Sequence, residues 1–139
     1  NNFIMSNKII IDASGAVFGR LSSFVAKKAL EGNEITVVNS DKTILTGNKK
    51  EIINKFSKLK RKGGFAQKGP YYSKIPCKML KRSIRNMLPN FRAGQGKDAI
   101  KRVKCYDGIP EELKEDKMVK INAPKKLKFI ELKELSEKI

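Results

Sequence analysis

The chain has 139 residues, of which 40% are hydrophobic, so it is long and apolar enough for one domain with a buried core. It carries 31 Lys and Arg against 14 Asp and Glu, and the formal net charge of +17 predicts an acidic partner, with nucleic acid as the first candidate and an anionic membrane as the second. It has no histidine and only two cysteines, which argues against a structural zinc site and removes the commonest general base.

Membrane, metal and cofactor partners are not expected. No apolar run approaches the roughly 20 residues that span a bilayer. The apolar patch near the N-terminus is cut off by Asp12 and lacks the length and cleavage site of a signal peptide. Cys77 and Cys105 belong to no CxxC pair, and we predict two free thiols in a reducing cytosol.

The first sixty residues predict an alternation of strands and helices. Lys8–Asp12 is a β-branched run typical of a buried strand, and a glycine turn separates it from an amphipathic stretch. Asn48 and Glu51 have the spacing of a helix-capping box. The expected order is strand 8–12, helix to about residue 30, strand 35–39, short strand 43–45 and helix 48–59. This order predicts a parallel or mixed sheet with helices packed on it.

The second half predicts further helices and one more strand. Pro76 suits the first turn of a helix and Pro89 ends it. The apolar side of this helix is expected to hold Met79, Leu80, Ile84, Met87 and Leu88. We then expect a short helix at 98–102, a strand at 103–106, a turn at 107–110 and a C-terminal helix at about 125–138. We predict a single α/β domain over 1–110, including a basic arm at 58–92, and a C-terminal extension over 111–139.

The stretch from Lys58 to Arg92 mixes cations, glycines and aromatic rings and contains no Asp or Glu. Like charges repel at contact distance, so an acid-free run of this length is favoured where a polyanion lies against it. RNA fits, because it offers phosphates to the cations and exposed bases to the rings. A merely solvated charged surface is the alternative, but the cations continue along one face of the helix that starts at Pro76.

The candidate RNA-binding residues fall into three groups. Cations that neutralise phosphates are Arg20, Lys58, Lys60, Arg61, Lys62, Lys68, Lys74, Lys78, Lys81, Arg82, Arg85, Arg92 and Lys97. Glycines that let the backbone approach RNA closely are Gly63, Gly64 and Gly69. Rings that stack on bases or riboses are Tyr71 and Tyr72.

Two glycine patterns raise the alternative of a nucleotide-dependent enzyme. Gly15 and Gly19 lie between a strand and a helix, where a phosphate can bind, but the dinucleotide fingerprint GxGxxG is absent. Gly94–Lys97 is similar to the end of a P-loop, but Asp98 stands where a Ser or Thr would hold magnesium. The acids form no acid–base pair by spacing, so we predict no catalytic residue and no small-molecule substrate.

Several motifs together carry a resemblance to a known family. They are Gly19-Arg20-Leu21, Thr46-Gly47-Asn48, Gly69-Pro70-Tyr71, the segment from Arg85 to Pro89, and the segment from Val103 to Pro110. In this order, over about residues 8 to 110, they resemble the universal large-subunit ribosomal protein thirteen family in its eukaryotic and archaeal form. Tyr72 departs from the family pattern, which often has histidine there, and little after Pro110 matches.

The resemblance implies an α/β/α layered domain with a four-stranded, mostly parallel sheet. It also implies a structural role in the large ribosomal subunit, with ribosomal RNA and neighbouring ribosomal proteins as partners. The expected location is the cytoplasmic ribosome, with assembly in the nucleolus if the source is eukaryotic. A free RNA-binding regulator of translation remains an alternative, because the same surface would serve it.

Overall fold

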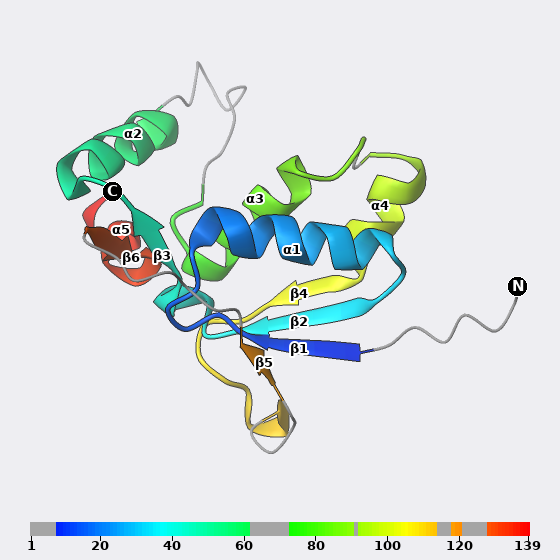
Figure 1. Cartoon of the computed structure of the whole chain (residues 1–139). Coiled ribbons are helices and arrows are strands. Elements are labelled where there is room, and N and C mark those ends of the chain that lie inside the picture. The colour runs from blue at the N-terminus through cyan, green and yellow to red at the C-terminus, as the bar shows by residue number, and fades with distance from the viewer. Residues whose placement is uncertain (1–7, 62–72, 91, 114–117, 121–127) are drawn as a thin grey trace, which may run out of the picture.

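The computed structural model describes residues 8–61, 73–90, 92–113, 118–120 and 128–139. Its centre is a four-stranded sheet with the strand order β4-β2-β1-β5, and every pairing in it is parallel (Figure 1). The strands are β1 (Lys8–Asp12), β2 (Glu34–Val38), β4 (Val103–Cys105) and β5 (Val119–Lys120).

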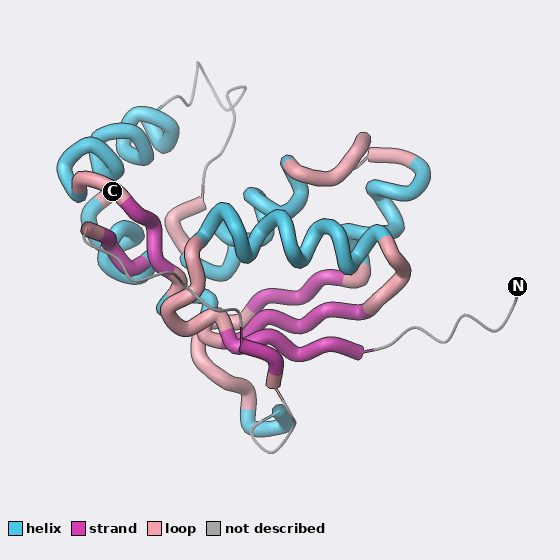
Figure 2. The backbone as a smooth tube through the Cα atoms, in the orientation of Figure 1, coloured by secondary structure: helices cyan, strands magenta, loops and turns pink. Residues whose placement is uncertain are grey.

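Three helices, α1 (Phe18–Leu30), α3 (Pro76–Asn86) and α4 (Gly94–Lys101), contact one another over one face of this sheet. The chain steps from β1 to β2 to β4 in one direction, and right-handed crossovers then place both connections on the same face. The return from β4 to β5 passes the opposite face, where the short 3-10 helix η2 (Glu111–Leu113) lies (Figure 2). The predicted three-layer α/β/α class with a parallel sheet is confirmed. The two faces of the sheet are covered unequally, by α1, α3 and α4 on one face and by the 3-10 helix η2 on the other.

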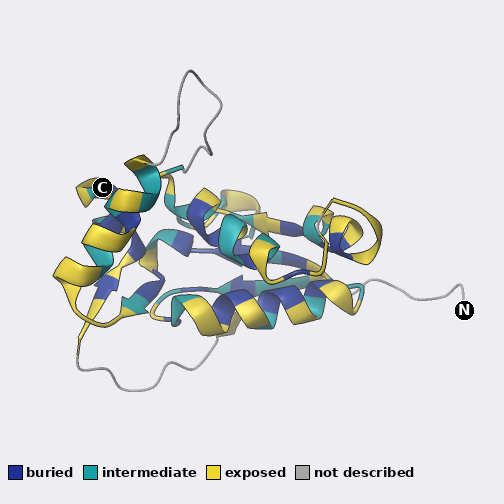
Figure 3. Cartoon of the chain, turned by 90° about the horizontal axis from the view of Figure 1, so that it is seen from above, coloured by how far each residue is buried: buried dark blue, intermediate teal, exposed yellow. Residues whose placement is uncertain are grey.

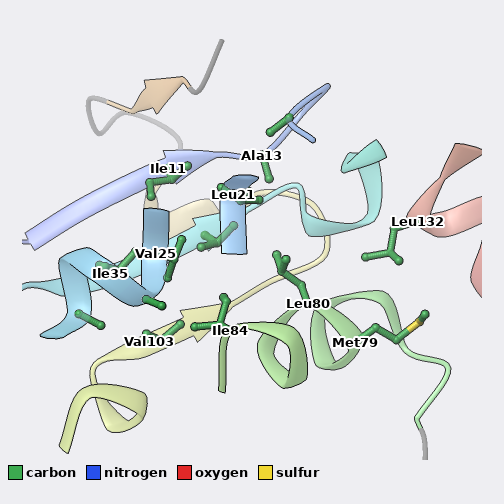
Figure 4. Close-up of a cluster of buried hydrophobic side chains, with 14 of the residues drawn as sticks. Ile11, Ala13, Leu21, Val25, Ile35, Met79, Leu80, Ile84, Val103 and Leu132 are labelled. Atoms are coloured by element: carbon green, nitrogen blue, oxygen red, sulfur yellow. The ribbon is translucent and has the colours of Figure 1, made fainter. Parts of the chain in front are cut away.

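The core lies between the sheet and these helices. Ile11, Ile35 and Val103 from three strands are buried, and Leu80 and Ile84 of α3 are buried with them (Figure 4). Burial of each such side chain contributes about 1.5–3 kcal/mol. Figure 3 shows the buried residues where helices and strands meet, with exposed residues on the outer faces of the helices.

A second, smaller sheet joins the strand predicted at 43–45 to a strand that was not predicted from the sequence. β3 (Ile44–Thr46) pairs antiparallel with β6 (Phe129–Glu131), and α5 (Leu132–Lys138) follows β6 directly. The helix predicted over about 125–138 is wrong at residues 129–131, which form a strand, and correct from Leu132 onward. Its apolar spacing was misleading, because Ile130 is buried between two exposed neighbours in the alternation of a strand. Residues 121–127 lie outside the described part of the chain.

The remaining helix, α2 (Lys49–Arg61), begins where the sequence predicted. The Oδ1 atom of Asn48 accepts a hydrogen bond from the Lys50 amide at 2.9 Å, which satisfies one of the first amides of α2. Met87 corrects an expectation: it follows the last turn of α3 and is 45% exposed, so it does not belong to the buried side.

The C-terminal segment contacts elements that precede residue 110. β5 pairs with β1, β6 pairs with β3, and α5 contacts both α2 and α3. The division of the chain into a domain over 1–110 and an extension stays a prediction. Within the described residues, no helix has both the length and the apolarity that crossing a bilayer requires.

Candidate nucleic-acid interface

The helix α3 positions the largest described group of candidate cations. Pro76 occupies its first turn, where the missing N–H costs nothing, and the extended Ile75 precedes it as the N-cap. The hydroxyl of Ser73 accepts a hydrogen bond from the Ile75 amide at 3.1 Å, which fixes the approach of the chain to the helix. One side of α3 is anchored in the protein interior through Met79, Leu80 and Ile84.

The opposite side of α3 carries the cations. Lys78, Lys81, Arg82 and Arg85 are spaced by three and four residues, so they share one face of the helix. Both lysines are exposed and both arginines are half-buried. The helix contains no Asp or Glu that would neutralise this face from within. A rigid apolar anchor therefore presents a cationic outer surface, as the sequence predicted.

A groove follows this cationic face. Its volume is about 450 Å³, which falls within the range of ligand pockets. Its lining combines the four cations of α3 with apolar atoms of Met79 and of Ile100, which comes from α4, and with Ser73. We call this the α3 groove. Sequence reasoning identified the cations but missed Ile100, which it had assigned to no site. Its placement of Met79 on the buried side of α3 is correct, since Met79 is only 1% exposed.

The candidate cations of α2 have a second explanation. Lys58, Lys60 and Arg61 lie in its last turn, where the negative end of the helix dipole favours positive charge. Lys58 and Arg61 are exposed and Lys60 is half-buried. The candidates Lys62, Gly63, Gly64, Lys68, Gly69, Tyr71 and Tyr72 lie outside the described residues, and their roles stay predictions.

The other candidates are spread over the ends of the helices. Arg20 is exposed in the first turn of α1, and Lys74 is exposed just before α3. α1 and α3 begin at the same end of the helix layer (Figure 1), where Arg20 lies in the first turn of α1 and Lys74 lies two residues before α3. Arg92 and Lys97 are exposed before and within α4, which follows the other end of α3.

The glycine turn after β1 is occupied by bonds within the protein. Gly15 has a φ of +73°, which glycine adopts readily, and its amide donates to the Lys42 carbonyl at 3.1 Å. The carboxylate of Asp12 accepts hydrogen bonds at 3.0 Å from the Ser14 amide and from the Asn39 side chain. Burial alone raises the pKa of Asp12, but these hydrogen bonds outweigh it and leave the pKa below its usual value. The turn is thus held by its own contacts, which accounts for its residues without a nucleotide.

The P-loop-like segment also has a packing explanation. Gly94 begins α4 with a φ of +66°. A Cβ atom at Gly96 would lie 1.7 Å from the carbonyl oxygen of Pro89, so only glycine allows α4 to pack on the turn that ends α3. The two glycines therefore serve the junction between α3 and α4.

The cysteines have the properties of inert thiols. Both are free. Burial raises the pKa of Cys105 to about 12, and burial together with the nearby Asp107 carboxylate raises the pKa of Cys77. A thiol with a raised pKa is a poor nucleophile and a poor metal ligand at neutral pH. Among the residues that the structure describes, no group of three or more His, Cys, Asp or Glu side chains is placed to hold a metal ion.

Comparison with known proteins gives a consistent result. The model of the family described as Ribosomal protein L13 matches residues 6–112. The large ribosomal subunit protein uL13 of Thermoplasma acidophilum is 48% identical over 113 residues, which cover 81% of this chain and 82% of that protein. The proteins of the same name from Thermoplasma volcanium and Methanosarcina barkeri are 43% and 41% identical, and each match covers 94% of this chain and 96% of the relative.

These three relatives are archaeal, so they give no support to the conditional expectation of nucleolar assembly. The matched residues include the sheet strands β1, β2 and β4, the helices α1 to α4, and hence the whole α3 groove. The chain belongs to the ribosomal protein L13 family, which is a family of structural ribosomal proteins and not of enzymes.

Proposed function

We propose that this protein is a structural constituent of the large ribosomal subunit that acts in translation by binding ribosomal RNA. The names of its relatives support the place in the large subunit. Its partners are then ribosomal RNA and neighbouring ribosomal proteins, and its location is the ribosome in the cytoplasm.

The observation that carries RNA binding is the acid-free cationic face of α3, backed by buried apolar residues. Cations that sit against phosphates release condensed counterions, and this release supplies sequence-independent affinity. Because α3 is anchored in the core, its cations are held in place before RNA arrives, and less ordering entropy is lost on binding. The α/β body acts as the scaffold that presents this face.

The basic arm adds contacts on both sides of α3. The exposed cations Lys58, Arg61 and Lys74 flank the segment that connects α2 to α3. Within that segment, we expect Lys62 and Lys68 to neutralise phosphates, the three glycines to allow close backbone approach, and Tyr71 and Tyr72 to stack on bases or riboses. Arg20, Arg92 and Lys97 extend the surface at the two ends of the helix layer.

The test is a sucrose gradient of a cell lysate, probed for this protein with and without ribonuclease. We expect co-migration with large subunits that is lost after nuclease treatment. The variant Lys81→Glu/Arg85→Glu is expected to fold, as judged by circular dichroism. It should no longer co-migrate with large subunits in the gradient. Lys27→Glu/Lys133→Glu makes the same charge change at exposed positions of α1 and α5, and it should stay with the subunit.

If the wild-type protein sedimented in the light fractions whether or not nuclease was added, the ribosomal role would be contradicted. A light pool that still binds RNA would instead favour the free translational regulator. If the α3 variant co-migrated with subunits as the wild type does, α3 would not be the contact surface.

A further inference from the structure

The α3 groove has a composition that phosphate binding alone does not require. A phosphate needs an exposed charge, and Lys78 and Lys81 at the rim provide it. The groove is also lined by the half-buried Ile100 and the almost fully buried Met79, and its two arginines are half-buried. The interior of the groove therefore suits a flat, partly apolar group more than a second phosphate.

A nucleobase is such a group. Guanidinium planes stack on the faces of bases, and sequence-specific recognition of RNA mostly uses unpaired bases that are free to leave the helix stack. The groove is about 450 Å³ in volume and open to solvent along α3, so it has room for a nucleotide. In a paired A-form helix the bases stack on one another and cannot enter the groove. Only the backbone phosphates of such a helix would contact the protein here, at the rim of the groove.

Resting on the RNA-binding role proposed above, we propose that the α3 groove binds an unpaired nucleotide of RNA. The base packs on Ile100 and against the guanidinium planes of Arg82 and Arg85. The phosphates on either side of this nucleotide lie on Lys78 and Lys81. The groove then selects a single-stranded or bulged nucleotide over continuous duplex.

The walls of the groove are fixed by the fold. α3 is anchored by Leu80 and Ile84, which are fully buried. α4 is held against the end of α3 by the close approach of Gly96 to Pro89, and this contact keeps Ile100 beside the arginines. A site of this kind is formed before the ligand binds, which favours selectivity for one ligand shape.

The experiment compares two fluorescent RNA hairpins of equal length and charge that share the same loop. The stem of one is fully paired, and the stem of the other has a single unpaired nucleotide. Each is titrated with the full-length protein at one salt concentration. We expect the bulged hairpin to bind about tenfold more tightly, which is the order expected for one stacked base. A 4-thiouridine at the unpaired position is expected to crosslink to a peptide from α3 or α4.

A charge-preserving variant isolates the role of the arginines. Arg82→Lys/Arg85→Lys keeps every positive charge but removes both guanidinium planes, so it should lose the preference for the bulged hairpin and keep its affinity for the paired one. Lys78→Arg/Lys81→Arg is the matched control at the rim, and it should keep the preference.

The outcomes separate this inference from the proposed function. Equal affinity of the wild type for both hairpins would overturn the nucleotide groove and leave RNA binding intact. An equal loss of affinity for both hairpins in Arg82→Lys/Arg85→Lys would also overturn it, because the arginines would then act on phosphates. Failure of the wild type to bind either hairpin would count against RNA binding itself.

Discussion

At Gly96 the chain leaves no room for a side chain. A Cβ atom there would lie 1.7 Å from the Pro89 carbonyl oxygen and 2.9 Å from the Asn90 carbonyl oxygen. Backbone atoms are the obstacle, so a rotamer change elsewhere does not relieve the clash. This one residue therefore sets the distance between the end of α3 and the start of α4, and with it the position of Ile100 in the α3 groove.

The substitution Gly96→Ala is expected to destabilise the protein by about 1–3 kcal/mol, the usual cost of overpacking. Urea unfolding followed by circular dichroism measures this change. Gly19→Ala is the matched control, because Gly19 lies in the first turn of α1 and a Cβ there meets nothing within 4 Å. The control is expected to be neutral or to gain up to about 1 kcal/mol. Equal stability of the two variants would contradict the close approach.

At the scale of elements, β6 shows how the C-terminal segment joins the body. Ile130 is fully buried, while Phe129 and Glu131 on either side of it are exposed. The strand pairs with β3, and the amide of Leu132, the first residue of α5, donates to the Thr43 carbonyl at 2.8 Å. This three-residue strand therefore fixes both the buried position of Ile130 and the point at which α5 begins.

Truncation of Ile130 tests whether this packing supports the fold. Ile130→Ala is expected to cost about 2–5 kcal/mol, because a cavity remains where the side chain was. Glu131→Ala in the same strand should change the free energy of unfolding by about 0.5 kcal/mol or less, since this side chain is exposed. Both values come from denaturant unfolding. A loss below about 1 kcal/mol for Ile130→Ala would mean that β6 is not part of the cooperative unit.

At the scale of the whole molecule, the net charge of +17 is unevenly distributed. Three ion pairs lie outside α3: Lys28 with Glu31 at the end of α1, Lys49 of α2 with Glu134 of α5, and Lys138 with Glu134 within α5. The segment from Lys58 to Arg92 holds no acid at all. The excess positive charge therefore concentrates around α3 and the arm, where it attracts a polyanion over several ångströms.

This distribution predicts a steep dependence of RNA affinity on salt. If six or more phosphates are neutralised, affinity should fall roughly 10³-fold or more between about 50 and 200 mM salt. Binding titrations at a series of salt concentrations give the slope of log affinity against log salt. Lys81→Glu/Arg85→Glu should reduce that slope. A flat salt dependence would point to a ligand held by uncharged contacts, as a nucleotide enzyme would require.

The sequence by itself determined the elements whose signals are local. The turn glycines around α1, Pro76 and Pro89 around α3, and the apolar residues Met79, Leu80 and Ile84 of α3 all act within a few residues, so their prediction is confirmed, whereas Met87 is exposed. The cationic face of α3 follows from helical spacing alone. The alternation of strands and helices predicted a parallel or mixed sheet. The family resemblance supplied the four-stranded layered form of the fold and the structural role, which spacing does not contain.

Only the tertiary structure decided which distant segments meet. The pairings of β3 with β6 and of β5 with β1 join residues more than eighty positions apart, and no local pattern in short strands encodes such a partner. The same holds for the α3 groove, where Ile100 of α4 joins cations of α3 because Gly96 permits their helices to touch. The positions of the charged residues could be predicted from the sequence. The shape of the groove that they line could not, because it depends on the packing of α3 against α4.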